Sequence, residues 1–197
     1  MPESIRDKVA IIGTGVTKFG EHWEEDASDM LVEAVYEACK EANVDLRKDI
    51  EAVWVSTLYD FSGMSGWAAS EPLGFYGKPI TRVENQCASG MDAVRNAAYA
   101  VAAHKCDIVI ACGVEKVLDQ GGRGLSQEIL YWHPSLAWQA APAYFAPCAI
   151  LAFKEWGWTR EDLARVAVKN HHNGAKHPKA HFRREITIET VINAPMV

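Results

Sequence analysis

The residue with the clearest capacity for chemistry is Cys87, which lies in the segment NQCASG at residues 85–90. This segment follows an apolar run that predicts a strand and opens an alanine-rich stretch that predicts a helix. A cysteine in the first turn of a helix lies among unpaired backbone N–H groups at the positive end of the helix dipole, and both favour the thiolate. A tight strand-to-helix turn also brings the side chain to the carboxyl edge of a parallel sheet, where α/β folds bind ligands. The position predicts a nucleophilic cysteine, with a buried structural cysteine as the alternative.

The other four cysteines are expected to pack rather than react. Cys39 lies on the inward stripe of a predicted helix, and Cys106 and Cys112 lie in or beside a predicted buried strand. Cys148 lies in an aromatic segment and could line a pocket, although packing is the simpler interpretation. Five cysteines without a C-x-x-C pair indicate neither a disulfide framework nor a structural zinc site, so we expect reduced thiols in the cytoplasm.

A second candidate region is the basic, histidine-rich segment at residues 165–184, which holds six Lys or Arg residues and no Asp or Glu. His177 and His181 have the i, i+4 spacing of helical metal ligands, but Pro178 interrupts any helix between them and no carboxylate lies nearby. We therefore predict no metal site. An anionic ligand or a neighbouring subunit would suit these cations, and a solvated face is the alternative. Glu115, just beyond the last predicted strand, is placed at the edge of a pocket.

The elements that position these residues are predicted in the order β-α-β-α-β-α-β, with strands at residues 8–13, 50–57, 80–85 and 106–113. Helices are expected at residues 26–42, 67–73 and 88–104. Such an order predicts a mostly parallel sheet with right-handed crossovers, covered by helices. The residues expected to face inward from the first and last of these helices are Leu31, Val35, Ala38, Cys39 and Ala42, then Met91, Val94, Ala98 and Val101.

Beyond this α/β region the pattern changes. Residues 115–149 are rich in glycine, proline and aromatic side chains, which is typical of a binding loop or lid. The aromatic residues between positions 131 and 145 indicate a sizeable apolar ligand, although such side chains also simply pack. Thr159 is predicted to begin a helix, with Asp162 at the reciprocal capping position and with inward-facing Leu163, Val166 and Ala167.

Composition limits the classes of protein to which the chain can belong. With 197 residues, 49% of them apolar and 23% charged, the chain is long enough for one ordinary domain or two small ones. A net charge of −6 argues against a dedicated nucleic-acid binder. Its apolar runs are too short to span a bilayer, and its N-terminus lacks the pattern of a signal peptide. We expect a cytoplasmic protein.

Three stretches of the sequence resemble the thiolase family. Residues 83–91 (VENQCASGM) resemble the segment around the acyl-accepting cysteine, and residues 107–115 (DIVIACGVE) resemble the following strand, which in thiolases commonly ends in G-G-x-E. Residues 169–182 (KNHHNGAKHPKAHF) resemble the basic stretch that closes the loop domain. The resemblance is closest to the sterol-carrier-protein and archaeal branch. It implies a thiolase-like N-terminal half, with an α/β core at residues 1–115, a loop-domain insertion and linker at residues 116–197, and no C-terminal half.

The resemblance also implies a reaction in lipid metabolism. Cys87 would take an acyl group from a 3-oxoacyl-CoA, or acetyl from acetyl-CoA in the condensing direction, and would pass it on, with coenzyme A as co-substrate and no tightly bound cofactor. The backbone N–H of Cys87 would lie in the oxyanion hole. The substrate- or CoA-side candidates are Glu115, Lys169, His172 and Lys176. The Gly-His-Pro histidine, the Asn-Glu-Ala-Phe or His-Asp-Cys-Phe segment and the Cys-x-Gly cysteine of thiolases do not occur in this sequence.

The same resemblance implies partners. Family members form dimers or tetramers and dimerise next to the nucleophile strand, while relatives in the archaeal branch often work with a zinc-ribbon/OB-fold acyl-CoA-binding protein. Without a second half, a sheet edge and a helix layer would be uncovered, which predicts obligate association with another half or another copy. Two other functions remain open at this point: a thiolase-like aldolase, and a non-catalytic scaffold or CoA-binding subunit.

Overall fold

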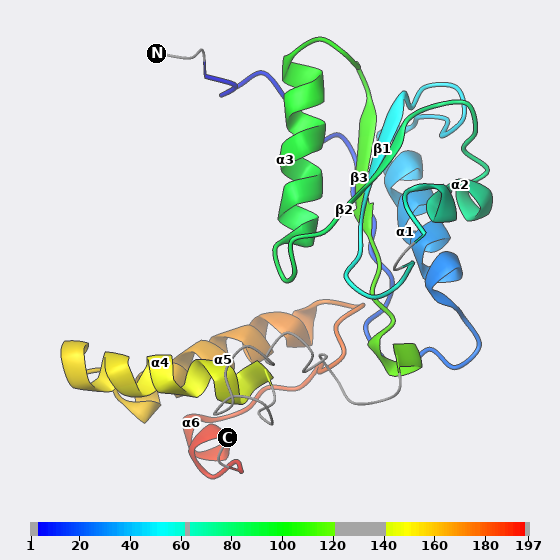
Figure 1. Ribbon diagram of the computed structural model, residues 1–197. Helices are drawn as coiled ribbons and strands as arrows, with labels where there is room; N and C mark the ends of the chain where they lie inside the picture. Colours follow the sequence, from blue (N-terminus) through cyan, green and yellow to red (C-terminus); the bar gives the residue numbers. More distant parts are fainter. Residues whose placement is uncertain (1–3, 62–63, 121–140, 196–197) are drawn as a thin grey trace. The chain divides into compact units, whose positions relative to one another are not determined.

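A computed structural model of the protein describes residues 4–61, 64–120 and 141–195, which form two units. The first unit contains the chain up to Thr17 together with residues 21–116, and the second contains residues 18–20 and the chain from Val117 onward. The elements of the first unit are α1 (Ala27–Ala42), β1 (Ala52–Ser56), α2 (Trp67–Leu73), β2 (Ile80–Val83), α3 (Ser89–Ala102) and β3 (Val109–Gly113) (Figure 1). Those of the second are a 3₁₀ turn (Val117–Gln120), α4 (Ala141–Trp156), α5 (Arg160–Lys176) and α6 (Ile188–Ile192).

The sheet of the first unit is parallel, with strand order β2-β1-β3. The central strand, β1, pairs with β2 from Val53–Ile80 to Ser56–Val83 and with β3 from Ala52–Val109 to Ser56–Gly113. Three of the expected strands and their parallel arrangement are therefore confirmed. Because all three strands run the same way, the segments that follow Ser56, Val83 and Gly113 leave the sheet at one edge.

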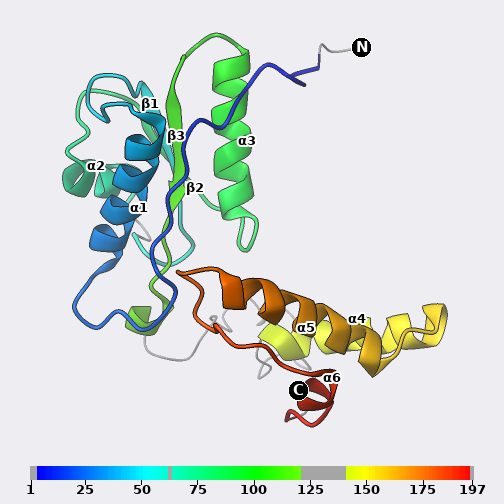
Figure 2. The same ribbon diagram turned by 180° about the vertical axis from the view of Figure 1, so that it is seen from behind.

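Helices cover both faces of this sheet. α3 lies on one face, and α1 with α2 lies on the other (Figures 1 and 2). The apolar stripe of α1 is buried as expected at Leu31, Val35 and Cys39. These side chains join a core with buried side chains of β1, of α2 and of the neighbouring loops, namely Ile50, Val53, Val55, Leu73 and Phe75.

The first expected strand, at residues 8–13, does not form a strand in the described part of the chain. Figure 2 shows this segment as an extended trace beside β3. The backbone N–H groups of Thr14 and Val16 donate to the carboxylates of Glu41 and Glu37 on α1 instead of to a neighbouring strand. The prediction was wrong because it took an apolar β-branched run as evidence of ladder pairing; Ile11 is in fact 80% exposed.

The inward face of α3 also differs from expectation. Met91 and Val94 are 75% and 51% exposed, whereas Ser89, Ala93 and Ala97 are buried. Small side chains allow a helix to approach a sheet closely, so the face with the small residues rather than the face with the large apolar ones packs on β1 and β3. The periodicity of α3 predicted the helix correctly, but the predicted inward face was wrong at Met91 and Val94, while Ala98 and Val101 are half-buried.

In the second unit, the irregular segment expected at residues 115–149 is helical from Ala141, where α4 begins. Of the expected aromatic pocket at residues 131–145, positions 131–140 lie outside the described residues, and Phe145 is exposed.

The capping box that was predicted for α5 is present. The Thr159 side chain accepts from the Asp162 N–H, and the Asp162 side chain accepts from the Thr159 N–H at 2.9 Å. The inward face was wrong at Leu163 and Val166, which are exposed, while Ala164 is fully buried. In the described residues, no helix is long and apolar enough to cross a membrane.

Candidate active site

Cys87 lies in the connection between β2 and α3, at the carboxyl edge of the parallel sheet. β2 ends at Val83, Ala88 is the N-cap of α3, and Cys87 comes directly before this cap. The side chain of Cys87 is exposed. The alternative of a buried structural cysteine is therefore wrong for this residue in the described structure.

Two successive backbone turns shape this connection. The Ala88 N–H donates to the Asn85 carbonyl at 2.9 Å, and the Ser89 N–H donates to the Gln86 carbonyl at 3.1 Å. Gln86 has φ +48°, in the left-handed region that residues with a β-carbon rarely adopt. The turn thus departs sharply from both the strand and the helix, and Cys87 is exposed within it.

Sequence reasoning missed the side chain that holds this turn, which is that of Ser89. Its hydroxyl accepts from the Asn85 N–H at 2.8 Å and donates to the Gln86 carbonyl at 2.6 Å. Ser89 is buried although it is polar. The signal available in the sequence was a hydroxyl residue at the start of a helix, a position where such side chains bond to nearby backbone groups.

The ends of the neighbouring strands pack closely beneath the start of α3. A β-carbon built on Gly113 would lie 2.2 Å from the Ser56 Oγ and 2.7 Å from the Ser56 carbonyl oxygen, so only glycine fits there. A β-carbon built on Gly90 would lie 3.8 Å from the same Ser56 Oγ. The close approach is thus between β3 and β1, while the amino end of α3 lies beside Ser56 at an ordinary contact distance.

Glu115 holds the loop that follows β1. Its carboxylate accepts from three consecutive backbone N–H groups, those of Leu58, Tyr59 and Asp60, at 3.0 to 3.3 Å. Arg82, on β2, donates from its guanidinium to the carbonyls of Thr57 and Leu58 in the same region. Both oxygens of Glu115 are therefore occupied by backbone amides, and its role toward CoA stays a prediction.

The basic candidates Lys169, His172 and Lys176 lie in the second unit, on α5, which continues to Lys176. His172 Nδ1 lies 2.9 Å from the Glu185 carboxylate, and Lys176 Nζ lies 2.7 Å from His172 Nε2. Since a lysine ammonium can only donate, the Nε2 of this histidine accepts and its proton is on Nδ1. Glu185 thus holds the ring of His172 from the segment that leads into α6.

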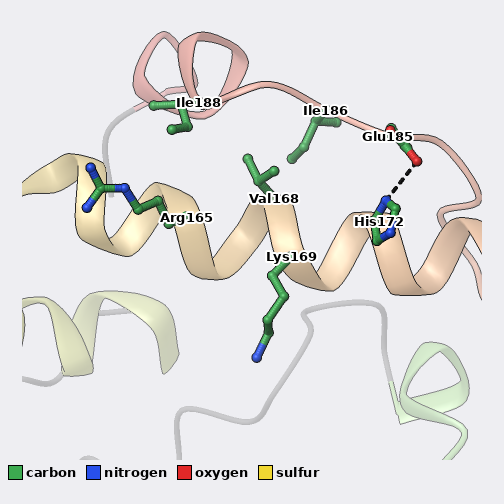
Figure 3. Close-up of a pocket in the computed structure, with 7 residues that line it drawn as sticks. All are labelled: Arg165, Val168, Lys169, His172, Glu185, Ile186 and Ile188. Atoms are coloured by element: carbon green, nitrogen blue, oxygen red, sulfur yellow. Dashed lines mark hydrogen bonds and ion pairs between the residues drawn. The ribbon is translucent and has the colours of Figure 1, made fainter.

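A shallow cavity of about 290 Å³ lies between α5 and the segment that leads into α6. Figure 3 shows Val168 pointing toward Ile186, while Lys169 points away from this segment. The structure thus brings His172 and Lys176 together, and Lys169, one turn before His172 on α5, lines the same cavity as His172. In the described residues, no group of three His, Cys, Asp or Glu side chains could hold a metal ion.

The remaining cysteines have different surroundings. Burial raises the pKa of the Cys112 thiol to about 12, and this thiol lies 3.7 Å from the Trp54 carbonyl. Burial, together with the nearby charge of Asp45, raises the pKa of the Cys39 thiol. Burial likewise raises the pKa of Cys106, with Glu51 and Asp107 adding to the effect. Cys148, on α4, is exposed like Cys87 but does not adjoin the start of a helix.

Comparison with known proteins identifies relatives along almost the whole chain. Residues 9–194 match the family described as "Thiolase, N-terminal domain". The chain is 36% identical to an acetyl-CoA acetyltransferase of Methanothermobacter thermautotrophicus, across 96% of this chain and 51% of that protein. It is 32% identical to benzoylsuccinyl-CoA thiolase subunit BbsB of Thauera aromatica, across 96% of this chain and 49% of that subunit.

Among solved structures, the chain resembles the Ltp2-ChsH2(DUF35) aldolase with a TM-score of 0.78 and 25% sequence identity, across 95% of this chain and 49% of that chain. The chain thus spans about half the length of the relatives that it matches.

Proposed function

The chain belongs to the thiolase family, and from this premise we propose that it is the nucleophile-bearing, N-terminal half of a thiolase-type acyl-CoA C-acyltransferase. The observation that carries the proposal is the exposed Cys87 at the carboxyl edge of a parallel sheet, directly before α3. In this position the sulfur is open to a substrate, next to the positive end of the α3 helix dipole.

In the proposed reaction, the Cys87 thiolate attacks the 3-oxo carbon of a 3-oxoacyl-CoA. The bond between the second and third carbons then breaks, acetyl-CoA leaves after its carbanion gains a proton, and the shortened acyl group stays on the sulfur as a thioester. The thiolate of a second CoA attacks this thioester, which releases the shortened acyl-CoA and regenerates Cys87. Both attacks place negative charge on a carbonyl oxygen, which backbone N–H groups at the start of α3 would stabilise.

Proton transfer in this reaction needs a base, which we propose a second thiolase half supplies. The chain spans about half the length of its acetyl-CoA acetyltransferase relative. The family resemblance places the activating histidine in the other half. A zinc-ribbon/OB-fold acyl-CoA-binding protein is a further proposed partner, and the name of the Ltp2-ChsH2(DUF35) aldolase includes a DUF35 component.

The test is acylation of the chain by acetyl-CoA at a mildly alkaline pH, where thiolates form without a base, followed by mass spectrometry of its peptides. We expect an acetyl group on the peptide that contains Cys87. Cys148 is a matched control within the chain, because it is exposed but does not adjoin the start of a helix. Equal labelling of the two cysteines, or no label at Cys87, would contradict acyl transfer.

A thiolase-like aldolase is the second candidate, favoured by the structural similarity to the Ltp2-ChsH2(DUF35) aldolase. An aldolase would cleave a 3-hydroxyacyl-CoA without an acyl-cysteine. In a complex with its second half, release of an aldehyde or ketone from such a substrate with no label at Cys87 would favour this reaction. Unchanged activity of the complex after Cys87→Ser would instead favour a scaffold or CoA-binding subunit.

A further inference from the structure

The turn that presents Cys87 has a backbone conformation that needs external support. Gln86 has φ +48°, and a residue with a β-carbon persists in this region only where its surroundings fix it. The flanking backbone bonds, Ala88 to Asn85 and Ser89 to Gln86, fix the ends of two overlapping turns. A side chain that contacts both turns could fix the peptide between them.

The Ser89 hydroxyl makes this contact. It donates to the Gln86 carbonyl at 2.6 Å, and it accepts from the Asn85 N–H at 2.8 Å. Ser89 is buried, so water does not readily replace its hydroxyl in these bonds. Its backbone N–H donates to the same Gln86 carbonyl at 3.1 Å. One residue therefore holds that carbonyl through two bonds.

Fixing the Gln86 carbonyl also fixes the N–H of Cys87. The two groups belong to one peptide unit, and no described peptide bond is cis. In a trans peptide the C=O and the N–H point in opposite directions. Because the carbonyl points toward Ser89, the Cys87 N–H points away from Ser89.

We propose that Ser89 is a positioning residue for Cys87, in that its hydroxyl aims the Cys87 N–H at the oxygen that becomes negative when Cys87 is acylated. This inference rests on the proposed acyl transfer. Ser89 does not touch the reacting atoms, and its effect reaches them through the Gln86–Cys87 peptide. Without the hydroxyl, only the Ser89 N–H holds the Gln86 carbonyl, so this peptide is held less firmly and the Cys87 N–H is aimed less well at the oxyanion.

Two reactions of the same sulfur separate this role from general support of the turn. Attack on an activated ester such as 4-nitrophenyl acetate forms a tetrahedral oxyanion, which an aimed N–H stabilises. Alkylation by iodoacetamide displaces iodide and forms no oxyanion. A loosened turn would alter both rates, whereas a misdirected N–H would slow acylation alone. The ratio of the two rates at Cys87 is therefore the readout.

The experiment measures both rates at Cys87 and at Cys148 by peptide mass spectrometry, in the full chain and in its Ser89→Ala variant. We expect acylation of Cys87 to fall roughly tenfold or more relative to alkylation, because small displacements of catalytic groups have effects of this size or larger. The same ratio at Cys148, on α4, should not change. Ser89→Thr, which keeps a hydroxyl, should restore part of the loss.

Ser70→Ala is the matched control, because it also removes a hydroxyl that donates to a backbone carbonyl, that of Phe75. Ser70→Ala should lower the melting temperature without changing the ratio at Cys87. Equal loss of both rates in Ser89→Ala, or an unchanged ratio, would overturn the positioning role while leaving acyl transfer intact. If Cys87 of the unaltered chain is acylated no faster than Cys148, the proposed function fails and the positioning role fails with it.

Discussion

At the scale of single residues, the five cysteines show how much the surroundings of a thiol decide what it can do. Cys87 and Cys148 are exposed, whereas Cys39 is buried and the pKa of Cys112 is raised to about 12 by burial. A thiol with a raised pKa remains protonated at neutral pH, and the protonated form is a poor nucleophile. The sequence predicted packing for Cys39 and Cys112 from the periodicity of their elements, and their surroundings agree.

Iodoacetamide should therefore distinguish these thiols. In the folded chain near neutral pH, we expect Cys87 and Cys148 to be alkylated first and Cys39 and Cys112 to remain unmodified. Peptide mass spectrometry over time measures the order. Denaturation in urea is the control, since it should make all four react. Early modification of Cys112 in the folded chain would contradict the burial described for its sulfur.

Glu115 shows what a sequence pattern cannot reveal about a residue. Its position beyond β3 placed it at a pocket edge, but its carboxylate accepts from the backbone of residues 58–60, far away in sequence. Such a contact depends on strand order, which periodicity does not give. Sequence reasoning therefore placed Glu115 just beyond β3 without finding its partners, and its place at a pocket edge stays a prediction.

Glu115→Ala should destabilise the first unit by about 2 to 3 kcal/mol, since hydrogen bonds to a charged group contribute about 1.5–3 kcal/mol and three amides lose their acceptor together. Urea unfolding followed by circular dichroism measures the change. Glu33→Ala, at an exposed position on α1, is the control and should stay within about 0.5 kcal/mol of the parent. A loss for Glu115→Ala no larger than that of the control would show that these bonds do not support the loop.

At the scale of elements, a helix was predicted correctly where the capping residues at its ends and the apolar periodicity of its interior indicated the same helix. α1 begins at Asp26 with a capping box and ends at a left-handed Asn43, and α5 begins at the predicted Thr159. The predictions failed at residues 8–13 and on the faces of α3. In both cases the sequence shows which residues are apolar but not which neighbour lies close enough to cover them.

Gly113 sets the distance between β3 and β1 at the site. We expect Gly113→Ala to destabilise the chain by about 1–3 kcal/mol, because the added carbon would overlap Ser56 at its side chain and its backbone. Unfolding in urea measures the loss, and Ser56→Ala in the same chain should recover only part of it. Gly20→Ala is the control, since the added β-carbon would lie 3.7 Å from His181 Nδ1, which is an ordinary van der Waals contact. Equal stability of both alanine variants would contradict the close packing.

The capping box of α5 predicts a response to pH. Hydrogen bonds from the Thr159 side chain and backbone lower the pKa of Asp162, with a smaller contribution from Arg165. Because the pKa of Asp162 is lower in the folded chain than in the unfolded chain, its carboxylate stabilises the cap at pH values above the ordinary aspartate pKa. This stabilisation is lost as the pH falls through the pKa of the folded state. The NMR signal of the Thr159 amide should shift over this acidic range. Asp162→Asn should abolish the shift, whereas Glu161→Gln should leave it; a shift that persists in Asp162→Asn would contradict the assignment.

At the scale of the whole molecule, the first unit leaves several large apolar side chains exposed to water. Met91 and Val94 lie one turn apart on the outer face of α3, and Ile11 and Ile12 lie on the extended N-terminal segment. The chain also spans only about half the length of its relatives. These two facts support the same inference, that in the functional protein another chain or another half covers this surface.

Alone in solution, the chain should therefore associate with further copies of itself, because burial of apolar surface contributes about 25 cal/mol per Å². Met91→Glu together with Val94→Glu should shift the chain toward the monomer without loss of the fold, since both side chains already face water and contribute little to the core. Light scattering measures the mass, and circular dichroism checks the fold. Tyr36→Glu, at an exposed position on α1, is the matched control and should associate like the parent. A parent chain that stays monomeric over a wide range of concentrations would show that this face needs no partner. Unchanged association of the double variant would place the contact elsewhere on the surface.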